Sequence, residues 1–172
     1  MSTVLKFSCL LWLLLCSLPW SHATEAKSIP ETFIADGTVQ VAFSPWDDTQ
    51  ALLIDAPCSG LGTLRRNPDM KWRQSEDDIA QMSQLQTSIL ASAARLIKPG
   101  GRVVYATCSL LEEENESIVT SFLSTHPDYE LRPMSEVLAE QKISLAMDDY
   151  LKLLPHRHHT DGFFAAVIER KA

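Results

Sequence analysis

The sequence predicts an α/β fold with a largely parallel sheet, and three observations support this prediction. Two short, mainly apolar runs, at residues 51–54 and 102–108, lack strict alternation and end in loops, as strands buried on both faces of a sheet do. Between them, residues 75–98 carry apolar side chains at the spacing of a helix. A strand, a helix and a second strand in this order form a βαβ unit, whose two strands run parallel.

The first predicted strand, 51–54, ends at Asp55, and Pro57 and Gly60 follow closely. The loop from residue 55 to residue 69 is rich in turn-forming residues and in arginine. We therefore expect the strand to stop at Asp55 and an irregular loop to lead to the helix.

The helix is predicted to begin at Ser75, because Asp78 stands three positions later and can complete a capping box. The run 98–101, Lys-Pro-Gly-Gly, cannot continue a helix and ends it. The apolar stripe that should face the sheet consists of Ile79, Met82, Leu85, Ile89 and Leu96.

The other expected elements lie on both sides of this unit. After the strand at 102–108 the pattern predicts a helix at 113–124 and strands at 150–154 and 163–169; before residue 51 it indicates one strand at 38–43 and a polar turn at 44–48. Ligands of parallel sheets bind beyond the carboxyl ends of the strands. The segments 55–58 and 107–109 each lie at such an end, so Cys58 and Cys108 should meet at one rim of the sheet.

Composition limits the class of protein. The chain has 172 residues, 45% of them hydrophobic, which is enough to bury the core of one globular domain. Its formal net charge of -7 has the wrong sign for holding nucleic acid by bulk electrostatics. An RNA substrate would need a local basic patch, or basic surface on another part of the protein.

The four cysteines fall into two pairs. Cys9 and Cys16 lie in an apolar amino-terminal run, whereas Cys58 and Cys108 follow the two predicted strands. No CxxC spacing indicates zinc or a redox motif. Spacing alone leaves two alternatives open for Cys58 and Cys108: a disulfide in an exported protein, or two separate thiols in a cytosolic one.

Residues 1–23 have the form of a secretory signal peptide, with Lys6 before an apolar core and a small-residue site ending at Ala23. The apolar run is too short to span a bilayer, so stable membrane association is not expected. The alternative is a leucine-rich stretch that arose by chance, for example from a truncated or frame-shifted gene. The location is therefore cytoplasmic if the leader is accidental and exported if it is real; residues 24–50 remain unassigned.

Two motifs carry a resemblance to a known family. Residues 55–60 read Asp-Ala-Pro-Cys-Ser-Gly and residues 107–109 read Thr-Cys-Ser. Together they resemble the RsmB/NOP/Sun family of SAM-dependent RNA (cytosine-5)-methyltransferases, in which these are the fourth and sixth motifs. The resemblance covers about residues 51–171 and includes the runs at 65–69, 71–72, 98–101, 113–116 and 161–164.

The resemblance implies a Rossmann-like class I methyltransferase fold and methyl transfer from S-adenosylmethionine (SAM) to C5 of a cytosine in rRNA or tRNA. Cytosine C5 is a poor nucleophile until a thiolate adds to C6. The family assigns this attack to the sixth-motif cysteine, here Cys108, and assists release with the fourth-motif cysteine, here Cys58. DNA cytosine methyltransferases place their nucleophile in the fourth motif, so Thr107-Cys108 favours the RNA class.

Contacts with the cofactor, with the target base and with the RNA are expected around these thiols. By resemblance, Asp55 lies against the cofactor and the target base, and Pro57 rigidifies the same loop. A cluster next to this loop indicates an RNA contact, with cations for phosphates and an indole that can stack on a base; it consists of Arg65, Arg66, Lys71 and Trp72. The histidine-rich run at 156–159 has no carboxylate or cysteine at ligand spacing, so no metal site is expected.

The family's glycine-rich SAM-binding loop is not found in this sequence, since none of its six glycines forms a Gly-x-Gly-x-x-Gly run. We therefore expect the chain to correspond to the second half of the methyltransferase sheet, starting near residue 51, and to bind SAM poorly and methylate little by itself. The alternative is a non-catalytic remnant or an exported binding protein that retains half of the fold. Nothing in the sequence indicates an oligomeric state.

Overall fold

The computed structural model describes residues 40–43 and 51–172 of the chain. The leader-like segment at 1–23 and the polar turn expected at 44–48 lie outside the described residues. The strand expected at 38–43 is found as β1 (Gln40–Phe43). None of the helices in the described ranges is long and apolar enough to cross a membrane.

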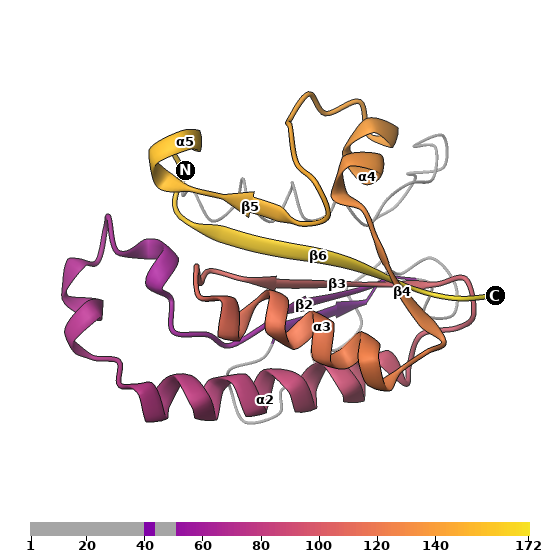
Figure 1. The fold of residues 1–172 in the computed structure, drawn as a ribbon, viewed down its shortest axis with the longest axis horizontal. Coiled ribbons are helices and arrows are strands. Elements are labelled where there is room, and N and C mark those ends of the chain that lie inside the picture. The colour runs from indigo at the N-terminus through magenta and orange to yellow at the C-terminus, as the bar shows by residue number, and fades with distance from the viewer. Residues whose placement is uncertain (1–39, 44–50) are drawn as a thin grey trace.

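The described strands form one sheet, seen nearly edge-on in Figure 1. Its order is β1, β2 (Ala51–Asp55), β3 (Arg102–Thr107), β6 (Phe163–Arg170) and β4 (Tyr129–Arg132). A short strand, β5 (Leu151–Leu153), pairs with the first residues of β6, while β4 pairs with its last residues. Both late strands predicted from the sequence are confirmed, β5 being shorter than expected.

The predicted βαβ unit is confirmed, because β2 and β3 are parallel neighbours joined through α2 (Glu76–Ala94). The expectation of a largely parallel sheet is wrong for the described residues, since the other strand pairs among them are antiparallel. The reason is topological: β4 runs in the same direction as β3, but β6 inserts between them in the opposite direction. Apolar patterns do not show which strand inserts where.

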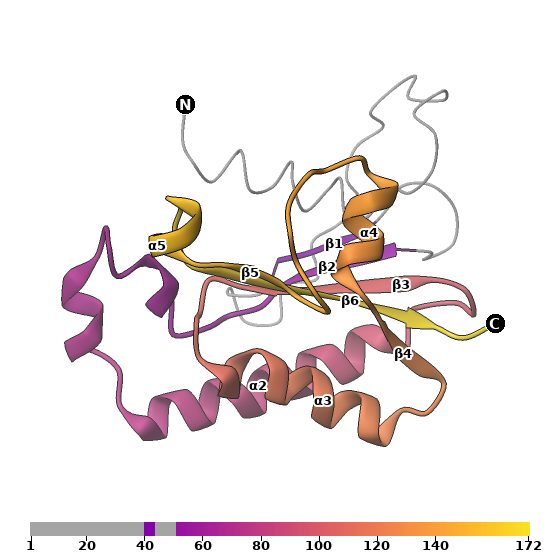
Figure 2. The same ribbon diagram turned by 45° about the horizontal axis from the view of Figure 1, so that its top comes forward.

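Helices cover the sheet on both faces, as Figure 2 shows. On one face lie α2 and α3 (Glu116–Thr125), and between them and the sheet is a core that includes Leu90, Tyr105 and Phe164. On the other face, α4 (Met134–Glu140) and the segment after it cover a second core. Alternate residues of β3 enter the two cores, so the strand is buried on both faces as predicted.

The start of α2 is confirmed and its buried face is corrected. The Ser75 hydroxyl accepts the Asp78 backbone N–H at 3.2 Å, and the Asp78 carboxylate accepts the Ser75 backbone N–H at 3.0 Å. Of the predicted stripe, Ile89 packs against the core, whereas Leu85 and Leu96 are 43% and 49% exposed. The fully buried residues of this segment are Gln86, Leu90, Ala93, Ala94 and, just after the helix, Ile97.

The helix predicted at 113–124 is divided in two. A single 3-10 turn, η4 (Glu112–Glu114), precedes α3, and the backbone leaves helical geometry at Asn115, where φ is -120° and ψ is -99°. Two further 3-10 turns, η2 (Leu61–Thr63) and η3 (Pro68–Trp72), lie in the loop after β2. The histidine-rich run at 156–159 lies mostly in a one-turn helix, α5 (Pro155–His158).

Candidate active site

Two thiols meet at the carboxyl ends of β2 and β3. Cys58 Sγ and Cys108 Sγ are 3.2 Å apart, and both residues are half-buried and free of any disulfide. The backbone hydrogen bond from Ala56 N–H to the Ala106 carbonyl, 2.9 Å, continues the pairing of the strands into the loops. The prediction that the two cysteines share one rim of the sheet is therefore confirmed.

The two thiols differ in acidity because one hydrogen bond joins them. When Cys108 is ionised, only the Cys58 S–H can donate in the bond between the two sulfurs, and this bond lowers the pKa of Cys108 below that of an ordinary thiol. The same bond, together with burial and the repulsion between the sulfurs, raises the pKa of Cys58. Cys108 is consequently the thiol that ionises first, and the thiolate is the nucleophilic form of cysteine.

A buried carboxyl group joins the two cysteine loops. Glu114 is fully buried, and its Oε2 accepts hydrogen bonds from the hydroxyls of Ser59 and Ser109, each at 2.5 Å. Its Oε1 accepts the Ser59 backbone N–H at 2.7 Å and the Gln86 side-chain amide at 3.2 Å. Since Ser59 follows Cys58 and Ser109 follows Cys108, one side chain holds the neighbours of both thiols.

Further bonds stiffen the same two loops. Gln86, in the middle of α2, also donates to the Pro57 carbonyl at 2.7 Å. The Thr107 hydroxyl donates to the Asn115 side-chain oxygen at 2.5 Å, and the Asn115 amide donates to the Ser109 carbonyl at 3.1 Å. The break in the helix at Asn115 turns Glu114 and Asn115 toward the cysteine loops, and the hydrogen bonds made there stabilise it.

The loop before β6 packs against the loops after β2 and β3 so closely that no side chain fits between them. Gly62 N–H donates to the Cys108 carbonyl at 2.8 Å, and Gly162 N–H donates to the Gly62 carbonyl at 2.8 Å. A methyl group on Gly62 would lie 2.3 Å from the Gly162 oxygen and 2.6 Å from the Cys108 oxygen. Both contacts are with backbone, so only glycine permits this approach of the three loops.

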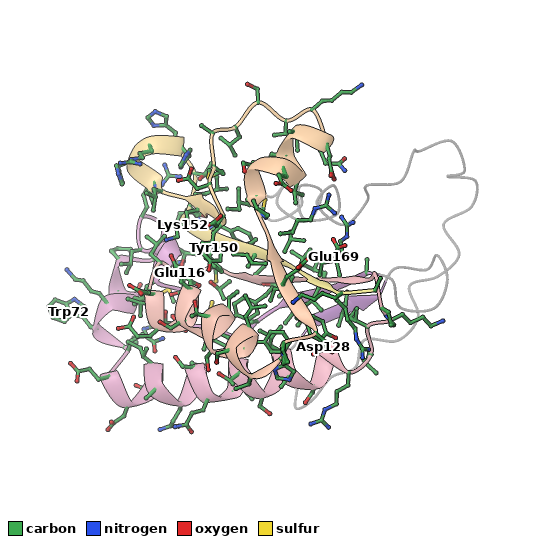
Figure 3. The ribbon with its side chains drawn as sticks, turned by 45° about the vertical axis from the view of Figure 1, so that its right-hand side comes forward. Trp72, Glu116, Asp128, Tyr150, Lys152 and Glu169 are labelled. Atoms are coloured by element: carbon green, nitrogen blue, oxygen red, sulfur yellow. The ribbon has the colours of Figure 1, made fainter. Side chains whose placement is uncertain are left out.

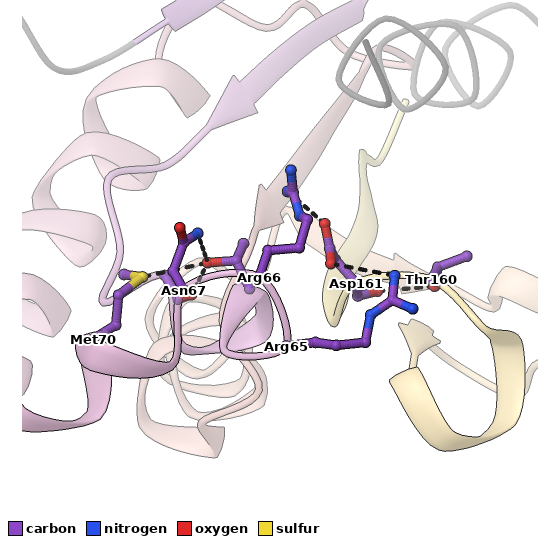
Figure 4. Close-up of polar contacts among 8 residues, drawn as sticks. Arg65, Arg66, Asn67, Met70, Thr160 and Asp161 are labelled. Carbon is purple, nitrogen blue, oxygen red and sulfur yellow. Dashed lines mark hydrogen bonds and ion pairs between the residues drawn. The ribbon is translucent and has the colours of Figure 1, made fainter.

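Asp161 anchors the two arginines that the sequence assigned to RNA. Figure 4 shows the Asp161 carboxylate between Arg65 and Arg66, with N–O distances of 3.9 Å and 2.5 Å. The aspartate is buried, whereas both arginines are exposed. These arginines therefore connect the loop after β2 to the loop before β6, in addition to any contact with RNA.

Lys71 and Trp72 form the outermost part of the same loop. The Trp72 side chain is 80% exposed and points away from the body of the protein in Figure 3. The Lys71 ammonium lies 4.7 Å from the centre of the indole ring. A large aromatic group exposed to this degree contributes nothing to the core, so its surface is available for a ligand.

Asp55 and Pro57 flank the cysteine pair on the β2 side. Asp55 ends β2 and pairs with Ala106 of β3 in the strand register. Although the residue is exposed, neighbouring protein partly desolvates its carboxyl group and raises the pKa of Asp55. The Asp55 charge also opposes ionisation of Cys108, which raises the pKa of that thiol slightly against the larger effect of Cys58.

Sequence analysis did not single out Glu114, Gln86 or Asp161 as functional. Glu114 and Asp161 each lie inside runs that resembled the family, but Glu114 stands in an acidic run typical of a solvated surface and the residues next to Asp161 give no sign of its ion pairs. Gln86 interrupts an otherwise apolar helix face, which is the one signal that could have indicated a buried hydrogen bond. Within residues 51–172, no three histidine, cysteine or acidic side chains are grouped in a way that could hold a metal ion.

Comparison with known proteins decides the family. Residues 35–169 match the sequence profile described as the 16S rRNA methyltransferase RsmB/F family. The chain belongs to this family. The matched stretch begins at residue 35 and so includes β1.

Relatives in the RsmB/F family are identical to this chain at about two fifths of the aligned residues. The chain is 43% identical to the probable ribosomal RNA small subunit methyltransferase B of Synechocystis sp. over 118 residues, 69% of this chain and 26% of that protein. It is 41% identical to the protein of the same name from Bacillus subtilis, covering 70% and 27%, and 40% identical to ribosomal RNA small subunit methyltransferase B of Sodalis glossinidius, covering 79% and 29%. The chain thus spans less than a third of the length of each of these three relatives.

Solved structures confirm the Rossmann-like methyltransferase fold for this part of the family. The crystal structure of PH0851 superposes with a TM-score of 0.61 at 43% identity, over 70% of this chain and 26% of that one. NSun6 from Pyrococcus horikoshii, crystallised with SFG, superposes with a TM-score of 0.56 at 28% identity, over 70% of this chain and 29% of that one.

Proposed function

We propose that this chain is the part of an RNA (cytosine-5)-methyltransferase that carries the nucleophile, with Cys108 attacking C6 of the target cytosine. The observation that carries the proposal is the pair of free thiols, 3.2 Å apart at the carboxyl ends of two parallel strands. The family and the names of the relatives support rRNA of the small subunit as the substrate.

Attack by Cys108 depends on its ionisation and on the orientation of the base. The hydrogen bond from Cys58 lowers the pKa of Cys108 and so favours the thiolate. We assign to the Asp55 carboxyl group a hydrogen bond with the cytosine ring edge, which orients the base. The thiolate then adds to C6 while negative charge develops at C5.

Release needs a base for the C5 proton, and we assign this role to Cys58. In the free protein, the bond and the repulsion between the two sulfurs raise the pKa of Cys58. Once the Cys108 sulfur is bonded to carbon, both effects are removed and the pKa of Cys58 falls. Cys58 can then lose its own proton to solvent, its thiolate takes the proton from C5, the electron pair re-forms the C5–C6 double bond, and Cys108 leaves as a thiolate.

SAM supplies the methyl group in this proposal, as the family and the solved complex of NSun6 with SFG, a SAM analogue, support. Of the described residues, Asp55 and Pro57 are the ones that would hold it. The fit rests on the exposed Asp55 carboxylate at the carboxyl end of β2, where sheets of this class bind their ligands. The Gln86 bond to the Pro57 carbonyl keeps this loop in place.

The experiment that tests the proposal is a methyl-transfer assay with labelled SAM and bulk bacterial RNA. We expect weak label in the RNA, because the family's glycine-rich SAM-binding loop is not found in this sequence, and digestion to nucleosides should show this label in 5-methylcytidine. Label in a cytidine methylated at the exocyclic amine would contradict the proposal, because that reaction needs no thiolate. Label that persists in Cys108→Ala would also contradict it, whereas no label from either chain is the result expected of a chain that has lost the activity of its family.

Replacing Cys58 by alanine is expected to move the pH dependence of the methyl-transfer step, measured in a single turnover because release is assigned to Cys58. Without the S–H donor the pKa of Cys108 rises, so the pH at which the rate reaches half its maximum should increase. Cys58→Ser is the matched control, since a hydroxyl still donates to the sulfur and should keep this limb of the profile near its original position. An unchanged profile in Cys58→Ala would contradict the assigned hydrogen bond.

The exposed indole of Trp72 is proposed to stack on a base of the RNA, with Lys71 next to it for a phosphate. Because stacking contributes about 1–3 kcal/mol per base, Trp72→Ala should raise the Kd for RNA about 5- to 150-fold. Filter binding with bulk RNA measures this change. Trp72→Phe retains a stacking ring and should bind nearly as well as the original chain; equal loss in both variants would argue against stacking.

A further inference from the structure

We propose that Cys58 and Cys108 are also a modification site, which a hydroperoxide converts into a disulfide and a thiol reductant reopens. The inference concerns the same two residues as the proposed function but does not depend on RNA, SAM or catalysis. It rests on the separation of the sulfurs, on the anchoring of the loops and on the different roles that the two thiols can take.

The separation of the sulfurs is already close to what a disulfide requires. A disulfide bond is about 2.05 Å long, whereas Cys58 Sγ and Cys108 Sγ are 3.2 Å apart, so an approach of about 1 Å is needed. Rotation of two half-buried side chains can supply such a movement. Both loops continue adjacent strands, which are about 4.8 Å apart, so the backbones lie at a spacing that a disulfide can bridge.

The loops are held together on the residues that follow each cysteine. Glu114 accepts bonds from both Ser59 and Ser109, and Gly62 N–H binds the Cys108 carbonyl. These contacts leave the sulfurs free while they prevent the loops from separating. The effective concentration of one thiol at the other is therefore high, which favours bond formation within the pair over reaction with a second molecule.

The chemistry needs one attacking thiolate and one resolving thiol. The Cys108 thiolate attacks one oxygen of hydrogen peroxide, the O–O bond breaks, and sulfenic acid forms with release of hydroxide. Cys58 then attacks the oxidised sulfur, the S–O bond breaks, and the oxygen leaves as water with the proton from the thiol. In total, the two thiols lose two protons and two electrons, and one peroxide becomes two molecules of water.

The consequence for the proposed function is complete and reversible loss of methyl transfer, because the disulfide removes both the attacking sulfur and the sulfur assigned to release. Reduction regenerates both thiols. A single cysteine could only continue to the sulfinic and sulfonic acids, which reductants do not reverse. The neighbouring Cys58 therefore protects Cys108 from irreversible oxidation.

The test is peptide mapping by mass spectrometry after treatment of the folded chain with hydrogen peroxide. Trypsin places the two cysteines on separate peptides, because Arg65 and Arg102 lie between them. We expect a linked peptide pair that lacks two hydrogens and that disappears after reduction. In Cys58→Ser the linked pair should be absent and Cys108 should instead carry the sulfinic or sulfonic acid.

Two results would overturn the proposal: Cys108 of the original chain going directly to the sulfinic acid, or Cys108 linked instead to Cys9 or Cys16. Chain unfolded in urea is the control for geometry and should give mixed pairings among the cysteines. Methyl transfer before oxidation, after oxidation and after reduction is measured in parallel. A chain that transfers no methyl before oxidation leaves the peptide map as an independent result, because the proposed disulfide does not depend on catalysis.

Discussion

Replacing Cys108 by alanine is expected to abolish methyl transfer to RNA, with a loss of about 10,000-fold or more. Without the thiolate no bond forms at C6, and C5 of cytosine stays too weak a nucleophile to take the methyl group. The measurement is incorporation of label from SAM into bulk bacterial RNA. Because Cys108 is only half-buried, the variant should unfold at nearly the temperature of the original chain.

Cys108→Ser tests whether activity requires the thiolate or only a side chain of this size. A hydroxyl keeps the size of the side chain, but it remains protonated at neutral pH and should restore less than a hundredth of the activity. Label retained in Cys108→Ala but lost in Cys58→Ala would reverse the assigned roles of the two cysteines. Label retained in both variants would contradict covalent catalysis by this pair.

Replacing Glu114 by alanine is expected to have the largest effect on stability, a loss of about 3–5 kcal/mol in the free energy of unfolding. The carboxyl group accepts from the Ser59 backbone, from the Ser59 and Ser109 hydroxyls and from the Gln86 amide. Its removal leaves these buried donors without an acceptor in a site that the surrounding chain closes. Urea unfolding followed by circular dichroism measures the change.

Glu114→Ala should also increase the distance between the two thiols. Once the bonds that join the loops are lost, modification of Cys58 and Cys108 by a thiol reagent should become faster than in the original chain. Glu113→Ala is the matched control, since Glu113 is the preceding residue and is exposed. If Glu114→Ala is as stable as Glu113→Ala, the role of Glu114 in joining the loops is wrong.

Much of the fold could be predicted because local patterns report local structure. The capping box at Ser75 and Asp78 involves residues three positions apart, and it was found where the pattern indicated. The parallel pairing of β2 with β3 follows from the helix between them. That pairing, together with the general rule for ligand sites in such sheets, was sufficient to bring Cys58 and Cys108 to one rim.

Other features could not be predicted because they depend on packing between distant segments. Leu85 and Leu90 are equally apolar and lie on adjoining sides of α2, and only contact with the sheet determines that Leu90 is buried. The insertion of β6 between β3 and β4 gives the sheet its mixed character. Arg65 and Arg66 were assigned to RNA, and their pairing with Asp161, almost a hundred residues later, has no sign in the local sequence.

The sequence by itself determined the family, the βαβ unit and the two cysteines, since each depends on short motifs and on residue spacing. Only the tertiary structure decided that the sulfurs lie 3.2 Å apart, which of them ionises first and which carboxyl group holds their loops. The physical reason is that hydrogen bonding and desolvation depend on distances in space. Glu114 is 55 residues from Ser59 along the chain, yet it accepts that residue's backbone N–H at 2.7 Å.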